Sequence, residues 1–333
     1  MSKIQFKALM VAENNDQQFI RKIISRDTSS LPQGDILINV KYSSLNYKDA
    51  LSAAGNKGVT KKYPHTPGID AAGIVVESKN EKFRSGDKVL VTGYDLGMNT
   101  SGGYGQYIQV PADWVVKVPT NLSLKETMIY GTAGFTAALS IYKLIHGGVK
   151  PTNGNILVTG ATGGVGSMAV SLLHKLGYAV IAATGKLDAK EMLLKIGAKD
   201  IVLRDELNDQ SGRMLLKGIY AGVIDTVGGN MLATAIKSTA YGGCVTCCGN
   251  VASPELSTSV YPFILRGITL YGVDSVMCPR NLRIEIWSLL ANEWKLNHLE
   301  QNVKEVSLEG LDEQINLILQ GKLKGRTIVN LDL

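Results

Sequence analysis

The sequence predicts an α/β protein in which a β-rich module precedes a doubly wound parallel sheet. From residue 3 to about residue 119, short β-like runs alternate with Gly, Pro, Asn and Asp. Beyond residue 123, short apolar runs alternate with helical stretches, as in a parallel sheet covered on both faces. A glycine-rich turn joins one of these runs to an amphipathic helix. We therefore expect about two domains from the 333 residues.

The β-rich module contains regularly spaced strand candidates bounded by turn residues. This pattern of strands and turns predicts an all-β, Greek-key or barrel-like module. The strand candidates are residues 36–42, 71–78, 87–93, 104–110 and 114–119.

The second part begins with a helical stretch over residues 124–146 and then alternates between strands and helices. Six apolar residues from Val165 to Leu176 fall on one helical face, and Gly177 provides a C-terminal stop. A further helix over 307–320 precedes a strand-like tail, whose docking site the pattern leaves open. The expected strands are 155–160, 178–185, 200–203, 222–229, 243–250 and 268–275, and the expected helices are 164–176, 188–196, 210–217 and 231–239.

Composition excludes several classes of protein. With 45% hydrophobic and 19% charged residues, the chain has the make-up of a globular core and not of a disordered tail. The 35 basic against 29 acidic residues give a net charge of +6, but no basic run exceeds Lys61-Lys62. The sequence therefore predicts no nucleic-acid-binding stripe.

The sequence also predicts a cytoplasmic protein with no membrane partner. Its first residues have neither an uninterrupted apolar segment nor the cleavage site of a secretory signal. Residues 151–174 lack charge, but Pro and Gly divide them into pieces too short to span a bilayer. Three of the four cysteines lie in the apolar segment 243–249, so we expect reduced, unreactive thiols.

The glycine-rich turn over residues 159–166 is the strongest functional signal. Glycine allows the backbone to turn tightly and approach a diphosphate, whose charge the helix N-terminus then stabilises. Ala161 replaces the first glycine of the dinucleotide pattern G-x-G-x-x-G, and Gly163 and Gly166 keep the register. The alternative is a tight turn without a ligand. The candidate diphosphate-binding residues are Thr162, Gly163, Gly164, Val165 and Gly166.

The residues after the next strand favour NADPH over NADH. An NAD-binding protein usually places Asp or Glu there to hold the adenosine ribose, but this chain has Thr184, Gly185 and Lys186. A hydroxyl and a cation suit a 2′-phosphate, and Arg204 after the third strand could add charge or stack on adenine. Alternatively, Lys186 is a solvated lysine at a helix start.

Two dehydrogenase architectures share this kind of turn. The short-chain type begins with the loop and uses a Tyr-x-x-x-Lys pair, whereas here the loop lies mid-chain and no tyrosine has Lys four residues on. A second group of segments runs through the chain in order: SLNYKDAL (44–51), YPHTPGIDAAG (63–73), GTAGFTA (131–137), LLHKLGY (172–178), IDTVGG (224–229), YGGCV (241–245), PFILRG (262–267) and LYGVDSVM (270–277). Through these segments the chain resembles the medium-chain dehydrogenase/reductase superfamily, most closely its acryloyl-CoA reductase and quinone oxidoreductase branch.

The resemblance implies a GroES-like β-barrel module plus a Rossmann doubly wound sheet. The GroES-like substrate and catalytic domain would comprise residues 1–123 and 299–333, and the NADPH-binding Rossmann domain residues 124–298. The family also implies a homodimer, in which the apolar strand at 268–273 could pair across the interface.

The zinc ligands of the zinc-dependent members are absent from the sequence. Gly68-Ile69-Asp70 stands where those members have Gly-His-Glu, and no cysteine precedes Cys244. Cys244 and Cys247 have C-x-x-C spacing, but no second pair accompanies them. We therefore predict a zinc-independent, metal-free protein.

The resemblance further implies NADPH-dependent hydride transfer to an activated double bond, in an acryloyl-CoA-type enoyl thioester or a quinone. Asn46 and Tyr47 occupy the family's cleft segment and are the catalytic candidates. Tyr47 would contact the cofactor and donate a proton, although it could instead only shape the pocket wall. By resemblance, Asn250, Ser275 and Gly321 complete the cofactor site. The alternative function is that of a non-enzymatic NADPH-binding protein, of a kind that can associate with nucleic acid.

Overall fold

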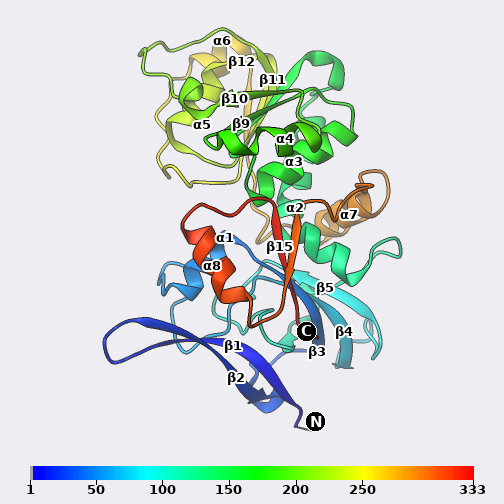
Figure 1. Ribbon diagram of the computed structural model, residues 1–333. Coiled ribbons are helices and arrows are strands. Elements are labelled where there is room, and N and C mark those ends of the chain that lie inside the picture. Colours follow the sequence, from blue (N-terminus) through cyan, green and yellow to red (C-terminus); the bar gives the residue numbers. More distant parts are fainter. Residues whose placement is uncertain (1–2) are drawn as a thin grey trace. The chain divides into compact units, whose positions relative to one another are not determined.

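The structure is a computed structural model that describes residues 3–333 (Figure 1). Its internal contacts divide the chain into two compact units. The first contains the chain up to Thr132 together with Val276–Ala291 and His298–Leu333, and the second contains Ala133–Ser275 and Asn292–Asn297. The domain boundaries expected at residues 123 and 299 stay a prediction.

The first unit is built on a seven-stranded sheet with the order β14-β15-β3-β4-β5-β7, in which β6 also pairs with β3. Hydrophobic side chains of β3, β4 and β5 form its core. The strands are β3 (Ile36–Ser44), β4 (Asp70–Ser78), β5 (Lys88–Thr92), β6 (Tyr107–Val110), β7 (Val116–Lys117), β14 (Val303–Val306) and β15 (Arg326–Asn330), beside a hairpin of β1 (Gln5–Glu13) and β2 (Phe19–Asp27).

The C-terminal tail is β15, which docks between β14 and β3. It runs parallel to β14 and antiparallel to β3, and its Ile328 and Val329 are fully buried. Three α-helices of this unit are α1 (Tyr47–Ala53), α7 (Arg280–Ala291) and α8 (Leu311–Leu319). Only α8 lies where the hydrophobic pattern predicts a helix.

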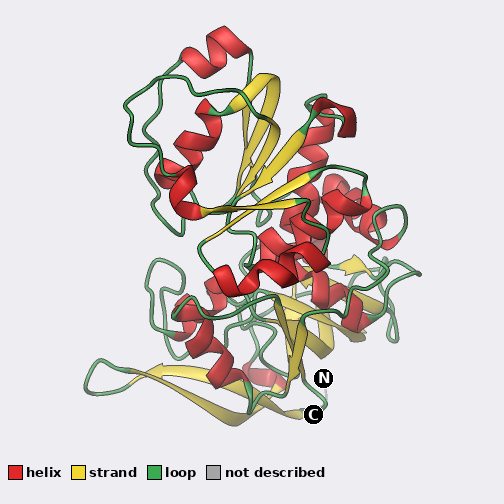
Figure 2. Ribbon diagram, turned by 45° about the horizontal axis from the view of Figure 1, so that its top comes forward, coloured by secondary structure: helices red, strands yellow, loops and turns green. Residues whose placement is uncertain are grey.

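The second unit contains a six-stranded, all-parallel sheet with the order β10-β9-β8-β11-β12-β13. Helices lie on both sides of this sheet (Figure 2). Since the strand order reverses between β8 and β11, their carboxyl ends form the topological switch point where such folds bind ligands. The strands are β8 (Asn155–Val158), β9 (Val180–Thr184), β10 (Asp200–Leu203), β11 (Tyr220–Asp225), β12 (Thr239–Cys247) and β13 (Thr269–Gly272). The helices are α3 (Gly164–Lys175), α4 (Lys190–Lys195), α5 (Gly229–Lys237) and α6 (Tyr261–Arg266).

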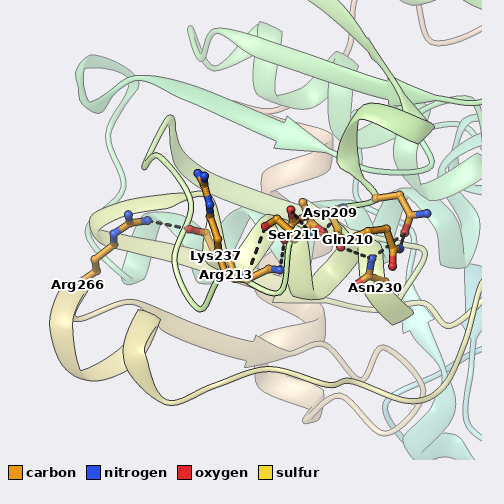
Figure 3. A network of polar contacts seen from close by, with 9 residues as sticks. Asp209, Gln210, Ser211, Arg213, Asn230, Lys237 and Arg266 are labelled. Atoms are coloured by element: carbon orange, nitrogen blue, oxygen red, sulfur yellow. Dashed lines mark hydrogen bonds and ion pairs between the residues drawn. The ribbon is translucent and has the colours of Figure 1, made fainter.

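The helix predicted over residues 210–217 is wrong, because this segment is irregular. Side chains bond there to nearby backbone groups, which competes with helix formation. The carboxylate of Asp209 accepts from the Ser211 amide at 3.1 Å, and Ser211 Oγ accepts from the Arg213 amide at 3.3 Å. An ion pair between Asp209 and Lys237 and hydrogen bonds from Asn230 fix the segment against α5 (Figure 3).

Helix α2 (Leu124–His146) is long and apolar enough to cross a membrane. However, 78% of its most apolar window is buried inside the protein, as in the core helix of a globular domain. Gly131 has non-helical angles (φ 49°, ψ −157°), so the segment consists of two helices joined at a kink. The division between the two units falls next to this kink, after Thr132.

Candidate active site

The glycine turn lies between the end of β8 at Val158 and the start of α3 at Gly164. Gly160 has a φ of +59°, which an L side chain rarely adopts. A Cβ atom on Gly166 would lie 2.3 Å from the carbonyl oxygen of Gly160 and 2.7 Å from Cα of Ala161. Gly166 therefore allows α3 to pack directly on the turn.

The first turn of α3 presents amide groups that the helix itself does not use. The first intrahelical hydrogen bond runs from the Ser167 amide to the Gly163 carbonyl at 2.9 Å, so the amides of Gly164, Val165 and Gly166 precede it. Gly163 occupies the N-cap position and has no side chain to cap them. With the buried Thr162 directly before it, this turn suits an anionic diphosphate.

Gly185 and Arg204, two of the residues predicted to bind the 2′-phosphate, lie next to each other in the structure. Strands β9 and β10 are parallel, and Thr184 is the register partner of Leu203. Gly185 and Arg204, which directly follow these two strands, are therefore neighbours. A Cβ atom on Gly185 would lie 2.8 Å from Nη2 of Arg204, so the guanidinium rests against the glycine backbone. The Lys186 amide donates to Thr184 Oγ1 at 2.9 Å, which completes a turn with hydroxyl and cationic groups.

Asn250 and Ser275 follow strands β12 and β13 of the same sheet. Asn250 is exposed beyond the end of β12, and its Cα would lie 3.2 Å from a Cβ on Gly228. It is thus close to the turn that follows β11. Ser275 lies three residues beyond the end of β13 and is half-buried.

Two buried residues at the switch point were not singled out as functional from the sequence. Asp225 ends β11 and accepts a hydrogen bond from Thr159 Oγ1 at 2.7 Å. Thr159 in turn accepts from the Thr226 amide at 3.0 Å. The sequence did contain a signal for Asp225, because this acidic residue ends an otherwise apolar strand in the segment IDTVGG.

Asn46 and Tyr47 lie in the first unit, at the start of α1. The Asn46 amide donates to Asp49 Oδ2 at 2.8 Å, and its side-chain Nδ2 donates to Asp70 Oδ2 at 2.7 Å. The carboxamide of Asn46 is therefore engaged by buried acids of its own unit. The Tyr47 side chain is 44% exposed and can meet a ligand.

Asp49 of α1 forms a buried cluster of ionisable groups with Asp70 and Arg326. Asp70 also accepts hydrogen bonds from Ser44 Oγ at 2.5 Å and from the amide and hydroxyl of Thr132 at 2.9 and 2.5 Å. Burial, and secondarily the charge of Asp70, raises the pKa of Asp49 to about 7.

Zinc does not fit the residues present. Among residues 3–333, no three His, Cys, Asp or Glu side chains are grouped so that they could hold a metal ion. The carboxylate of Asp70 accepts hydrogen bonds from Asn46, Ser44 and Thr132, so its oxygens are already occupied by donors. Burial raises the pKa of Cys244 and Cys247, and that of Cys248 to about 12, which opposes the thiolate form that zinc requires.

Gly321 terminates α8 and has a structural role there. Its φ is +66°, its amide donates to the Ile318 carbonyl at 3.0 Å, and the next amide, of Lys322, donates to the Leu317 carbonyl at 2.9 Å. This is the usual glycine stop of a helix. A contact between Gly321 and a cofactor stays a prediction.

Comparison with known families and proteins gives the same assignment along the whole chain. Residues 32–120 match the model described as "Alcohol dehydrogenase GroES-like domain", and residues 164–292 match "Zinc-binding dehydrogenase". "Putative quinone oxidoreductase YhfP" of Bacillus subtilis is 44% identical over 98% of this chain and 99% of its own length. "Acrylyl-CoA reductase AcuI" of Ruegeria pomeroyi is 40% identical over 98% of this chain and 99% of its own. This chain belongs to the medium-chain dehydrogenase/reductase family.

Solved structures of medium-chain reductases extend the similarity to three dimensions. The Salmonella enterica yhdH oxidoreductase, in complex with NADP, is 41% identical with a TM-score of 0.95 and covers 98% of this chain and 100% of its own. Bacillus subtilis yhfP, with NAD bound, is 43% identical with a TM-score of 0.96 over the same shares. The predicted α/β fold class, with a GroES-like and a Rossmann part, is thereby confirmed.

Proposed function

We propose that this medium-chain reductase uses NADPH to reduce an activated double bond, with an acryloyl-CoA-type enoyl thioester as the first substrate class and quinones as the second. The observation that carries the proposal is the uncapped glycine turn at the switch point of the parallel sheet. Similarity over nearly the full chain to an acrylyl-CoA reductase and to a quinone oxidoreductase supports both substrate classes.

The residues of the second unit fit NADPH. The amides of residues 162–166 would hold the diphosphate, and Lys186 and Arg204 would hold the 2′-phosphate. No carboxylate stands at residues 184–186 to favour the 2′-hydroxyl of NAD. When bound, NADPH supplies the hydride. Asn250 and Ser275 are proposed as further contacts to the cofactor, and so is Gly321 of the first unit.

Tyr47 is the proposed proton donor and ligand contact in the first unit. Its phenol is exposed, whereas the Asn46 carboxamide is held by Asp70 and fixes the backbone at the start of α1. We therefore assign Asn46 to positioning Tyr47. A conjugated carbonyl accepts hydride without a metal when a hydrogen-bond donor stabilises the developing charge on its oxygen.

The test follows NADPH oxidation with acryloyl-CoA, crotonyl-CoA and a benzoquinone. The proposal predicts the highest kcat/KM with acryloyl-CoA. Tyr47→Phe is expected to lower kcat/KM for the enoyl thioester by about 10²-fold. Its Kd for NADPH should stay close to that of wild type. An unchanged kcat/KM in this variant would remove the proton-donor role.

The alternative offered by the sequence was a non-enzymatic NADPH-binding protein. It predicts NADPH binding, no turnover with any of the three acceptors, and salt-sensitive binding to nucleic acid. We propose instead that nucleic acid is not a partner, since the longest basic run is a pair of lysines, and that membranes are not partners, since the apolar helix α2 is mostly buried inside the protein.

We further propose a cytoplasmic homodimer. All four cysteines are free, as is usual in a reducing compartment. Strand β13 forms an edge of the parallel sheet, and Val260, Tyr261, Ile264 and Leu265 expose apolar side chains at and beside α6. Open strand edges and exposed apolar residues are features of interaction surfaces. Sedimentation of the wild type and of Ile264→Glu tests this, with a monomeric wild type as the contradicting result.

A further inference from the structure

Two turns are joined at the carboxyl edge of the parallel sheet, where β8 and β11 are neighbours. Thr159 follows β8, Asp225 ends β11, and both side chains are fully buried. Thr159 Oγ1 donates to Asp225 Oδ1 at 2.7 Å and accepts from the Thr226 amide at 3.0 Å. Thr226 Oγ1 donates to the Thr159 carbonyl at 2.9 Å. Side chains of each turn thus bond to the other.

The second carboxylate oxygen of Asp225 fixes the turn that follows it. Asp225 Oδ2 accepts from the Gly228 amide at 2.8 Å and from the Val227 amide at 3.2 Å. Buried carboxylates require such donors, because a desolvated acceptor without a partner is costly. The same side chain therefore determines the shape of its own turn and its connection to Thr159.

Thr226 also lies between two segments of the proposed cofactor site. A Cβ atom on Gly160, in the glycine turn, would lie 2.3 Å from Thr226 Oγ1. A Cβ atom on Gly249, directly before Asn250, would lie 2.0 Å from the carbonyl oxygen of Thr226. The backbone after β11 is thus in direct contact with the turns after β8 and β12.

We infer that Thr159, Asp225 and Thr226 are positioning residues for the dinucleotide, a role that rests on the proposed function. They keep the glycine turn and the turn after β12, which contains Asn250, at a fixed distance from each other in the absence of a ligand. Preorganised hydrogen-bond donors bind more tightly because less ordering remains to be done on binding. Loss of these contacts should therefore weaken NADPH binding while leaving the chemical step intact.

Thr159→Val tests the inference, with Thr159→Ser as its matched control. Valine keeps the shape but removes the hydroxyl, whereas serine keeps the hydroxyl that bonds to Asp225 and Thr226. Fluorescence titration is expected to show about a tenfold higher Kd for NADPH in Thr159→Val. The KM for NADPH should rise in parallel, with kcat unchanged, and Thr159→Ser should behave as wild type.

A Thr159→Val protein that binds NADPH as tightly as wild type, even with a lower Tm, would overturn the inference, because the hydroxyl would then be purely structural. If Thr159→Val does not fold, Thr226→Val with Thr226→Ser as control removes a single bond of the junction and carries the same expectation. If the wild type itself fails to bind NADPH, the proposed function is overturned as well. Binding by the wild type and equally by all variants overturns the positioning role alone.

Discussion

Replacement of Gly166 by alanine should disrupt both the glycine turn and NADPH binding. The added Cβ would lie 2.3 Å from the Gly160 carbonyl oxygen, whereas ordinary contacts begin at 3.4 Å. The turn must therefore retreat from α3 by roughly 1 Å, at a cost of about 1–3 kcal/mol as for other overpacked sites. At about 2 cal/mol/K of unfolding entropy per residue, that cost corresponds to a Tm lower by about 1–4 °C for a chain of 333 residues.

Gly163→Ala is the informative counterpart, because the protein itself has room for this methyl group. The nearest atom to its Cβ is the Gly160 carbonyl oxygen at 3.4 Å, and its φ of −77° suits any residue. We expect a Tm close to that of wild type, with a loss of at most ~1 kcal/mol in capping. The Kd for NADPH should nevertheless rise by about tenfold or more, since the methyl group would lie where the diphosphate approaches.

The assay combines thermal unfolding without ligand and fluorescence titration with NADPH for wild type and both variants. The expected pattern is a larger fall in Tm for Gly166→Ala than for Gly163→Ala, and weaker NADPH binding for both. If Gly163→Ala were to bind NADPH as wild type does, the diphosphate could not lie against this turn, and the reasoning from the glycine pattern would be refuted.

Three further predictions concern the cofactor choice, a buried carboxyl group and metal dependence. Lys186→Ala combined with Arg204→Ala should reduce the preference for NADPH over NADH by about 10–100-fold, through loss of two charged hydrogen bonds, and steady-state kcat/KM with both cofactors measures it; an unchanged preference would exclude these cations. The raised pKa of Asp49 means that the folded state binds its proton more tightly than the unfolded state, so stability should decline as the pH rises from 3.8 to about 7. Thermal unfolding across this range should show a weaker decline in Asp49→Asn, and an equal decline in both proteins would assign it to other groups. Dialysis against a chelator should leave kcat/KM unchanged, and elemental analysis that finds one zinc per chain would contradict this.

The glycine turn and the alternation of strands and helices could be predicted because both depend on local sequence. Met168, Ala169 and Leu172 mark the buried face of α3, and β10 spans the predicted residues 200–203. The α1 segment was missed because seven residues are too few for a helical period to stand out. The helix predicted over 210–217 was wrong because the side chains of Asp209 and Ser211 accept hydrogen bonds from neighbouring amides. Hydrophobic periodicity contains no information on such polar contacts.

The functional residues divide in the same way. Lys186 and Arg204 follow strands 2 and 3 of an expected parallel order, so their proximity could be anticipated, whereas the close approach of the Arg204 guanidinium to Gly185 required the register of β9 and β10. The partners of Asn46 could not be predicted. Asp70 and Arg326 are 24 and 280 residues away in the chain, and only the pairing of β15 with β3 brings the tail to this cluster.

The sequence by itself determined the order of elements, the glycine turn, the absence of an acidic residue at 184–186 and the family resemblance, because each is written in neighbouring residues. The tertiary structure alone decided that Thr159 meets Asp225, that Asn46 is held by Asp70 and that β15 lies between β14 and β3 in the sheet of the first unit. The physical reason is that these contacts join residues far apart in the chain, whose meeting depends on strand order and burial and not on local conformational preference.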